Sequence, residues 1–251
     1  MARVRIIGPG RAGTSLARAL TAAGWDVAPL LARGDDLTPA AQGVDLLVIA
    51  TPDDRVREVA RAVEPVERTV VAHLAGSLGL GAVAPHRRRA AVHPLVALPT
   101  PAIGARRLVG AWFAVAGDPL VRDVVRSLGG RWFEVGDADR PVYHAAAVIA
   151  SNHLVALLGQ VERLSDAAGV PFEAYIDLAR ATLDNVATLG PAAALTGPAA
   201  RGDEATIRRH LRALPPEERR AYRSLVEAAR RLAQRPQPTE GTPPDRRDGE
   251  R

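Results

Sequence analysis

Short apolar runs recur along the first half of the chain, separated by stretches that mix polar and apolar residues. The runs fall at residues 4–7, 27–31, 46–50, 70–72, 90–92, 113–115 and 132–135. Such runs, alternating with helix-like stretches, are typical of a parallel sheet with crossover helices. Leu16, Ala17 and Leu20 give the first helix one apolar face. Gly24 stands where that helix should end, and Pro29 makes the second strand the least regular.

The pattern changes after residue 136, where helical periodicity replaces the short apolar runs. Residues 141–168 form one helical pattern without an internal proline, and Gly169-Val170-Pro171 ends it. Further helices are predicted at residues 172–189, 203–214 and 216–234. The fold class is therefore α/β, with a Rossmann parallel sheet domain at residues 1–136 and an all-helical domain at residues 137–234. Residues 235–251 hold almost no apolar side chain and are expected to form a disordered tail.

Composition narrows the chemistry that this chain can perform. Of its 251 residues 47% are hydrophobic, which is ample for a core. Cysteine is absent, which excludes disulfides and thiolate chemistry, and all 33 basic residues are arginine, which excludes a catalytic lysine. No run of eighteen residues is wholly apolar and no leader precedes the first strand, so a cytoplasmic protein without a membrane partner is expected. The net charge of +5 is too modest to favour a nucleic-acid partner.

A glycine-rich motif lies between the first predicted strand and the first predicted helix. Gly8-Pro9-Gly10-Arg11-Ala12-Gly13 has the spacing of a dinucleotide fingerprint. Gly8 allows the tight turn, Gly10 lets the backbone approach a pyrophosphate, and Gly13 lets helix and strand pack closely. The helix N-terminus then directs free N–H groups at phosphate, with Arg11 and Ala12 in its first turn. The motif predicts binding of a nicotinamide dinucleotide.

Arg33 favours NADP over NAD as that dinucleotide. It follows the second predicted strand, where an arginine pairs with a 2′-phosphate and a carboxylate accepts from a ribose hydroxyl. Asp35 or Asp36 would take the ribose role if the strand ended two residues later. At the ends of later strands, Thr51 with Pro52 and Gly76 with Ser77 are expected to lie beside the cofactor.

Candidate catalytic residues come from one strand end and one helix face. His93 ends a predicted strand, at the edge where open α/β sheets place their ligands. His144, Ser151 and Asn152 share a helical stripe with Val148. A histidine on an apolar face can also be a hydrogen-bonded core residue, and His93 before a proline can belong to a turn. The spacing of the histidines offers no metal site.

Five motifs in order resemble one bacterial family that joins a Rossmann-like NADP-binding domain to a helical domain of unknown function. They are the fingerprint, His73-Leu74-Ala75-Gly76-Ser77, His93-Pro94-Leu95, Tyr143-His144-Ala145-Ala146 with Ala150-Ser151-Asn152, and Leu195-Thr196-Gly197-Pro198 with Arg201-Gly202-Asp203. The family is placed in the 6-phosphogluconate dehydrogenase-like group, near pyrroline-5-carboxylate and ketopantoate reductases. The resemblance covers nearly all of the chain except the tail.

The resemblance implies an NADP-linked reductase whose helical domain completes the cleft and often builds a homodimer. Some members are thought to reduce 2-dehydropantoate to pantoate. Related enzymes use a lysine four residues before an asparagine, whereas Val148 stands in that place before Asn152. We therefore expect reduction of the carbonyl or imine of a small anionic metabolite, with Asn152 and Ser151 holding the reacting oxygen. His144 or His93 would supply the proton, since an ordinary histidine titrates near neutral pH. The alternative is a non-catalytic NADP(H)-binding regulator.

Overall fold

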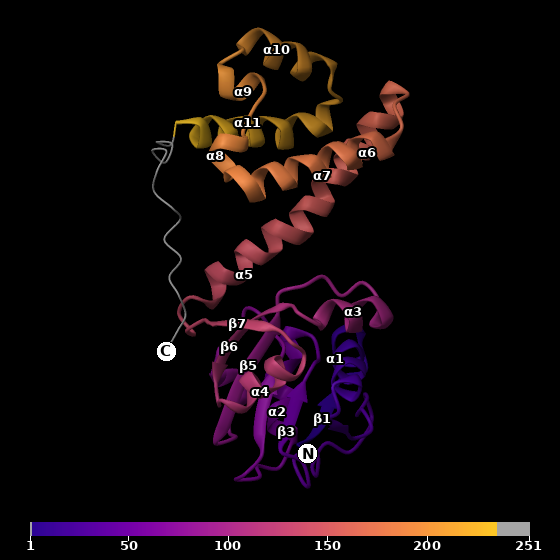
Figure 1. Cartoon of the computed structure of the whole chain (residues 1–251), viewed down its shortest axis with the longest axis vertical. Coiled ribbons are helices and arrows are strands. Elements are labelled where there is room, and N and C mark those ends of the chain that lie inside the picture. Colours follow the sequence, from indigo (N-terminus) through magenta and orange to yellow (C-terminus); the bar gives the residue numbers. More distant parts are fainter. Residues whose placement is uncertain (1, 235–251) are drawn as a thin grey trace. The chain divides into compact units, whose positions relative to one another are not determined.

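The computed structural model describes residues 2–234, and its contacts divide the chain into two compact units (Figure 1). The units are Met1–His153 and Leu154–Arg251. This division lies later than the boundary expected after residue 136. The physical reason is that Tyr143 and His144, on the helix that follows, pack against His93 of the sheet. The predicted tail, residues 235–251, lies outside the described residues.

All seven predicted strands are present and form one sheet in the first unit (Figure 1). The strands are β1 (Arg3–Ile7), β2 (Asp26–Val27), β3 (Leu46–Ile49), β4 (Val70–His73), β5 (Arg88–Pro94), β6 (Trp112–Gly117) and β7 (Arg131–Glu134). Their order across the sheet is β2-β1-β3-β4-β5-β6-β7. The chain therefore leaves β1 toward one side of the sheet and returns to the other side with β3. The crevice at this switch point, outside the carboxyl ends of the strands, is where doubly wound sheets bind their ligands.

Two details of the sheet differ from the prediction. The second strand ends at Val27 instead of residue 31, because Pro29 has no N–H to donate to the neighbouring strand. After Val27, Leu31 forms an isolated bridge with Ile7. The sheet is also not wholly parallel, since β6 runs antiparallel to β5. Apolar runs in strands buried on both faces do not encode direction, so the sequence pattern could not reveal this reversal.

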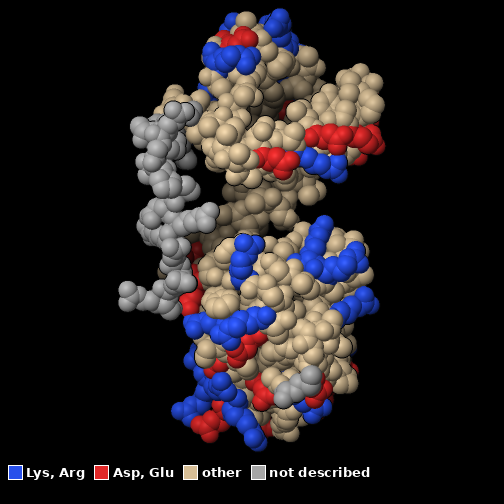
Figure 2. Space-filling view, in the orientation of Figure 1, with Lys and Arg blue, Asp and Glu red and all other residues tan. Residues whose placement is uncertain are grey.

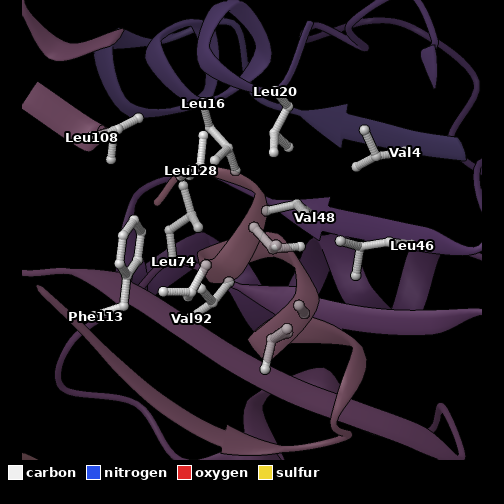
Figure 3. Packing of buried hydrophobic residues seen from close by; sticks show 14 of the residues in the cluster. Val4, Leu16, Leu20, Leu46, Val48, Leu74, Val92, Leu108, Phe113 and Leu128 are labelled. Carbon is white, nitrogen blue, oxygen red and sulfur yellow. The ribbon is translucent and has the colours of Figure 1, made fainter. Parts of the chain in front are cut away.

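Alternate residues of the central strands enter separate cores on the two faces of the sheet. Ile6, Leu46 and Val48 join one cluster, part of which appears in Figure 3, whereas Ile7 and Leu47 join the other. The two-residue period of a strand produces this separation. Helices α1 (Arg11–Ala22), α3 (Pro101–Leu108) and α4 (Leu120–Ser127) contribute to the first cluster, and α2 (Val56–Ala62) with the 3-10 turn η2 (Leu80–Val83) contributes to the second.

The long helical pattern at residues 141–168 is confirmed, with one irregularity. It comprises α5 (Arg140–Val148), a π-helical segment η3 (Ile149–His153) and α6 (Leu154–Ala168). Wide π turns are frequent at functional sites, and this one contains Ser151 and Asn152. The sequence pattern did not predict it.

The second unit is helical, as predicted, from α6 onward. It continues with α7 (Phe172–Leu189), α8 (Pro191–Ala194), α9 (Pro198–Arg201), α10 (Glu204–Ala213), the 3-10 turn η4 (Pro216–Glu218) and α11 (Arg219–Ala233). The expected helices at residues 172–189, 203–214 and 216–234 are confirmed within a few residues. The short α8 and α9 were not predicted, since each is a single turn begun by a proline.

By length and composition alone, the helical run Arg140–Ala168 would be able to cross a membrane. This segment contains no run of eighteen wholly apolar residues, because polar residues such as Ser151 and Asn152 interrupt it. The same test is passed by helices of proteins that never enter a membrane. A cytoplasmic protein without a membrane partner therefore stays a prediction.

Candidate active site

The glycine loop between β1 and α1 is packed as the fingerprint requires. Gly8 has φ +108, and a Cβ there would lie 2.7 Å from the carbonyl oxygen of Ala50. A Cβ on Gly13 would lie 2.0 Å from the carbonyl oxygen of Gly8. A Cβ on Gly10 would meet nothing within 4 Å, so this residue borders open space. Gly8 and Gly13 are thus needed for the fold of the loop, and Gly10 leaves room for a ligand.

The N-terminus of α1 borders that open space, and no acidic side chain of the helix neutralises its positive end. Gly10 caps the helix and has no side-chain hydrogen bond to offer, and the first turn contains no acidic residue. The first N–H groups of a helix lack partners within it and carry part of the positive end of its dipole. This end of α1 is consequently suited to an anion.

A cavity of about 550 Å³ lies on the β2 side of the loop. Its lining includes Gly8, Gly10, Arg33 and Arg55. The alternative carboxylates have local partners: Asp35 accepts from the N–H of Ala32 at 2.7 Å and Asp36 from that of Thr38 at 2.9 Å. The Thr38 hydrogen bonds also lower the pKa of Asp36.

A second cavity, of about 540 Å³, continues along the other side of the loop. Gly10, Ala50, Thr51 and Pro52 line both cavities, while Arg11, Ala12, Ser151 and Asn152 line the second one. The hydroxyl oxygen of Thr51 is buried and has no hydrogen-bond partner among residues 2–234. This cavity therefore connects the fingerprint with two of the predicted catalytic residues.

A third cavity, also of about 540 Å³, adjoins the second at Val96, Ala97, Ser151 and Asn152. All four predicted catalytic residues line it, and they come from β5, α5 and the π segment: His93, His144, Ser151 and Asn152. Most of the remaining lining is apolar: Pro94, Leu95, Val96, Ala97, Phe133, Ala146, Ala147, Val148 and Ala150. Tyr143 completes the lining. The third cavity is thus an apolar pocket with a small polar group at its wall.

His93 and Tyr143 form the shortest polar contact of this pocket. The Nδ1 atom of His93 and the hydroxyl oxygen of Tyr143 share a hydrogen bond of 2.6 Å. The tyrosine ring also packs edge-on against Phe133, at 5.7 Å between ring centroids. The ring of His144 also packs edge-on against His93, with 5.9 Å between the ring centroids. Tyr143 is held by its hydrogen bond to His93 and by edge-on ring contacts with Phe133 and His93.

Burial and neighbouring positive charge alter the proton affinity of this group. Burial, the nearby His144 and Arg140 lower the pKa of His93 to about 4. Burial raises the pKa of the Tyr143 hydroxyl to about 12, against the opposing effect of Arg140. Both side chains are therefore uncharged at neutral pH, and a role for His93 or His144 in supplying the proton stays a prediction.

A second polar group is buried behind the pocket. Arg140 and His73 are fully buried, and within the described residues no guanidinium nitrogen of Arg140 has a hydrogen-bond partner. Asp137 lies 3.9 Å from the Arg140 guanidinium, and its carboxylate accepts from the N–H of Leu80. Burial, followed by Arg140, lowers the pKa of His73 to about 4.

Gly76 and Ser77, which stay predicted to lie beside the cofactor, make close contacts within the sheet unit. A Cβ on Gly76 would lie 2.6 Å from His144 and 2.9 Å from His93, so this buried glycine lets the two histidines pack against the strand end. The Ser77 hydroxyl is 2.8 Å from a carboxylate oxygen of Asp53 and donates to it. Neither residue lines the three cavities. The lack of a side chain at Gly76 therefore leaves room for His93 and His144, and the Ser77 hydrogen bond joins the loop after β4 to the turn at Asp53.

Sequence reasoning named most of this site and missed three parts of it. Tyr143 was noted only as part of a family motif, although its place beside His144 could have drawn attention. Arg140 was one arginine among 33 and had no distinguishing signal. The loop at residues 96–99, which lines the second cavity, carries only apolar residues and proline and so gave no chemical signal.

The arginines do not form one continuous basic stripe on the face of the sheet unit drawn in Figure 2. Separate basic groups alternate there with acidic ones. Among the described residues of the sheet unit, Arg88 pairs with Asp118 and Arg122 pairs with Glu134. The absence of a nucleic-acid partner stays a prediction.

Residues 113–229 are similar to a family model described as "Domain of unknown function (DUF2520)". The match covers the end of the sheet unit and nearly all of the described helical unit, and it agrees with the resemblance drawn from the sequence motifs. No curated protein sequence matches the chain. The wider grouping with 6-phosphogluconate dehydrogenase-like proteins stays a prediction.

Solved structures share the whole architecture. A Bacteroides fragilis protein proposed to be an NADP oxidoreductase is 20% identical with a TM-score of 0.75, over 92% of this chain and 98% of its own. A reductive aminase from Aspergillus terreus, solved with NADPH and ethyl levulinate, is 18% identical with a TM-score of 0.67, over 92% and 94%. A pyrroline carboxylate reductase from Plasmodium falciparum, solved with NADP, is 13% identical with a TM-score of 0.60, over 92% and 98%. At such identities the likeness establishes a shared Rossmann fold with a helical C-terminal part.

Proposed function

We propose that this protein is an NADPH-dependent reductase of a small carbonyl or imine compound. The observation that carries the proposal is the continuity of the three cavities across the sheet edge. Gly10 and Thr51 are shared by the first two, and Ser151 and Asn152 by the last two. A dinucleotide is long enough to occupy the first two cavities, which leaves the apolar pocket for a substrate.

The residues present fit a dinucleotide at each part of this path. Gly10 borders open space, and the uncapped N-terminus of α1 offers N–H groups for the pyrophosphate. The unpartnered hydroxyl of Thr51 offers a further polar contact. Arg33 lies in the cavity on the β2 side and pairs with a 2′-phosphate, which favours NADP over NAD. The similar structures solved with NADP or NADPH support this choice of cofactor.

The catalytic roles follow from the junction between the second and third cavities. Bound NADPH supplies a hydride to an electrophilic carbon. Ser151 and Asn152 hold the oxygen or nitrogen of the reacting double bond, because both have polar side chains where cofactor and substrate cavities meet. His93 and His144 form the polar wall beside the reacting atom. The π segment turns Ser151 and Asn152 toward this junction.

The pocket favours an uncharged substrate over the anionic one expected from the sequence. Among the described residues that line it there is no arginine and no other permanent cation. A desolvated carboxylate without a partner costs several kcal/mol. We infer that the part of the substrate entering this pocket is an apolar ketone or imine. In the substrate panel below, 2-dehydropantoate is the anionic compound with which neutral substrates are compared.

The active protein is proposed to be a homodimer. Large apolar side chains of the helical unit are exposed, with Val155 at 69%, Leu178 at 62% and Leu189 at 58%. Exposed apolar side chains on neighbouring helices are a frequent feature of subunit interfaces. A second copy of the chain is the partner that the family resemblance implies.

The proposal is tested by NADPH oxidation against a panel of neutral ketones, cyclic imines and 2-keto acids that includes 2-dehydropantoate. We expect turnover of at least one neutral member, and a loss of kcat of at least about 100-fold in Asn152→Ala with His144→Ala. The control is His210→Ala, which removes a histidine from the helical unit away from the three cavities and should leave kcat unchanged.

Two results would contradict these roles. If the Asn152 and His144 double variant turned over as fast as its control, the assignment of the site would be wrong. If NADPH bound and no member of the panel consumed it, the protein would be the non-catalytic NADP(H)-binding regulator instead of a reductase.

A further inference from the structure

Tyr143 brings a phenolic hydroxyl to the lining of the third cavity. Hydride addition to a ketone leaves a negative oxygen that must receive a proton. The chain contains no lysine, so a lysine cannot give this proton. Tyr143 lines the same pocket as Ser151 and Asn152. It is the one phenol among the described lining residues.

His93 determines what the Tyr143 hydroxyl can do. The two residues share a single short hydrogen bond, 2.6 Å between Nδ1 and the hydroxyl oxygen. Either the tyrosine donates its hydrogen to Nδ1, or Nδ1 carries a hydrogen and donates it to the tyrosine oxygen. Only the second arrangement leaves the O–H of Tyr143 free to donate to a third atom in the pocket.

The surroundings of His93 keep its ring neutral. Burial, His144 and Arg140 from α5, and His73 from β4 all disfavour a second proton, and Asp53 from the loop after β3 opposes them weakly. Its pKa of about 4 leaves imidazolium scarce at neutral pH. A neutral ring can still hold one hydrogen at Nδ1, so His93 can donate to Tyr143 without carrying charge.

We propose that Tyr143 is the catalytic residue that protonates the reduced substrate, and that His93 orients its hydroxyl and replaces the hydrogen it gives up. This inference rests on the proposed reductase function. A hydride adds to the carbonyl carbon as the C–H bond at nicotinamide C4 breaks, and the carbonyl π electrons move to oxygen. That oxygen takes the Tyr143 hydrogen, and the tyrosine oxygen takes the Nδ1 hydrogen of His93. A solvent proton adds to Nε2 of His93 as the Nδ1 hydrogen leaves, so the ring stays neutral throughout.

The first test uses the free full-length protein and needs no turnover. Nitrogen-15 spectra of histidine-labelled protein at pH 7, with His93→Asn for assignment, report which ring nitrogen of His93 carries the hydrogen. The proposal requires the Nδ1–H form and a change in that signal in Tyr143→Phe. A ring protonated at Nε2 alone, with Nδ1 accepting from the tyrosine, would overturn it.

The second test separates a proton donor from a structural tyrosine. It compares a ketone from the panel with a quaternary N-methyl iminium salt such as 1,2-dimethyl-1-pyrrolinium, whose reduction needs a hydride and no proton. Tyr143→Phe keeps the ring packed on Phe133 and should lower kcat for the ketone about 10²- to 10⁴-fold, with less than about threefold change for the iminium salt. Tyr222→Phe is the matched control, because Tyr222 shares a 2.7 Å hydrogen bond with His210 in the helical unit.

The outcomes distinguish this inference from the proposed function. Equal losses for both substrates in Tyr143→Phe would indicate a structural role and refute the inference. Absence of turnover with every substrate in the wild-type chain would reject the reductase function, while the nitrogen-15 result would still decide the arrangement of the hydrogen bond.

Discussion

At the scale of single residues, the three fingerprint glycines have different tasks. A Cβ on Gly13 collides with backbone, whereas a Cβ on Gly10 meets nothing within 4 Å. We expect Gly13→Ala to lower the free energy of unfolding by about 1–3 kcal/mol, because neither the loop nor the helix can yield without strain. Gly10→Ala should change it by less than about 0.5 kcal/mol while weakening NADPH binding at least about tenfold. Urea denaturation and calorimetric titration of both variants measure these effects.

The opposite pattern for these two glycines would contradict the packing described for the loop. If Gly10→Ala unfolded more easily than Gly13→Ala, a Cβ at residue 10 would have to meet other atoms, contrary to the open space described there. If Gly10→Ala bound NADPH as the wild type does, the pyrophosphate would lie elsewhere.

The buried histidines make stability depend on pH. His73 has a pKa of about 4 in the folded chain against 6.5 as its ordinary value. Between these values the unfolded chain binds more protons than the folded one, so stability rises with pH and is lost as the solution is acidified from 6.5 to 4. One such histidine contributes at most about 1.4 kcal/mol per pH unit.

We therefore expect His73→Gln to flatten the fall in unfolding free energy between pH 6.5 and pH 4, measured by urea denaturation at several pH values. His153→Gln is the control, because His153 is exposed. An unchanged slope in His73→Gln would show that His73 is not held neutral by its surroundings.

At the scale of elements, the close approach of α1 and α3 depends on a small residue. A Cβ on Gly104 would lie 2.1 Å from the hydroxyl oxygen of Ser15. Gly104→Ala should lower the free energy of unfolding by about 1–3 kcal/mol, and adding Ser15→Ala should recover part of that loss by removing the hydroxyl. Gly81→Ala, where a Cβ meets nothing within 4 Å, is the control. Thermal unfolding of the single and double variants tests this, and simple additivity of the two losses would argue against direct contact.

The sequence predicted the elements well because burial leaves a periodic signal. Strands such as β3 and β4 are covered on both faces and so appear as continuous apolar runs. The π segment at Ile149–His153 leaves no such signal, since one wide turn changes neither composition nor the overall helical period. The pairing of His93 with Tyr143 joins residues 50 positions apart, and no local pattern encodes a contact of that separation. The strand-end rule placed His93 at the site, and the structure added its partner.

At the scale of the whole molecule, the exposed apolar side chains of the helical unit predict self-association. Leu178→Glu places a charge where a second copy should pack, and it should convert a dimer to a monomer in light scattering coupled to size exclusion. Val109→Glu, at a side chain of similar exposure in the sheet unit, should leave the dimer intact. A wild-type chain that is monomeric at micromolar concentration would refute the proposed homodimer.

The central claim is that the glycine loop and Arg33 bind NADPH, and calorimetric titration of the full chain tests it most directly. NADPH should bind one molecule per chain, and NADH at least about tenfold more weakly, since a 2′-phosphate paired with arginine contributes more than about 1.4 kcal/mol. Arg33→Ala should remove most of that difference, whereas Arg18→Ala, outside the three cavities, should preserve it. Absence of saturable NADPH binding at millimolar concentration would contradict the account.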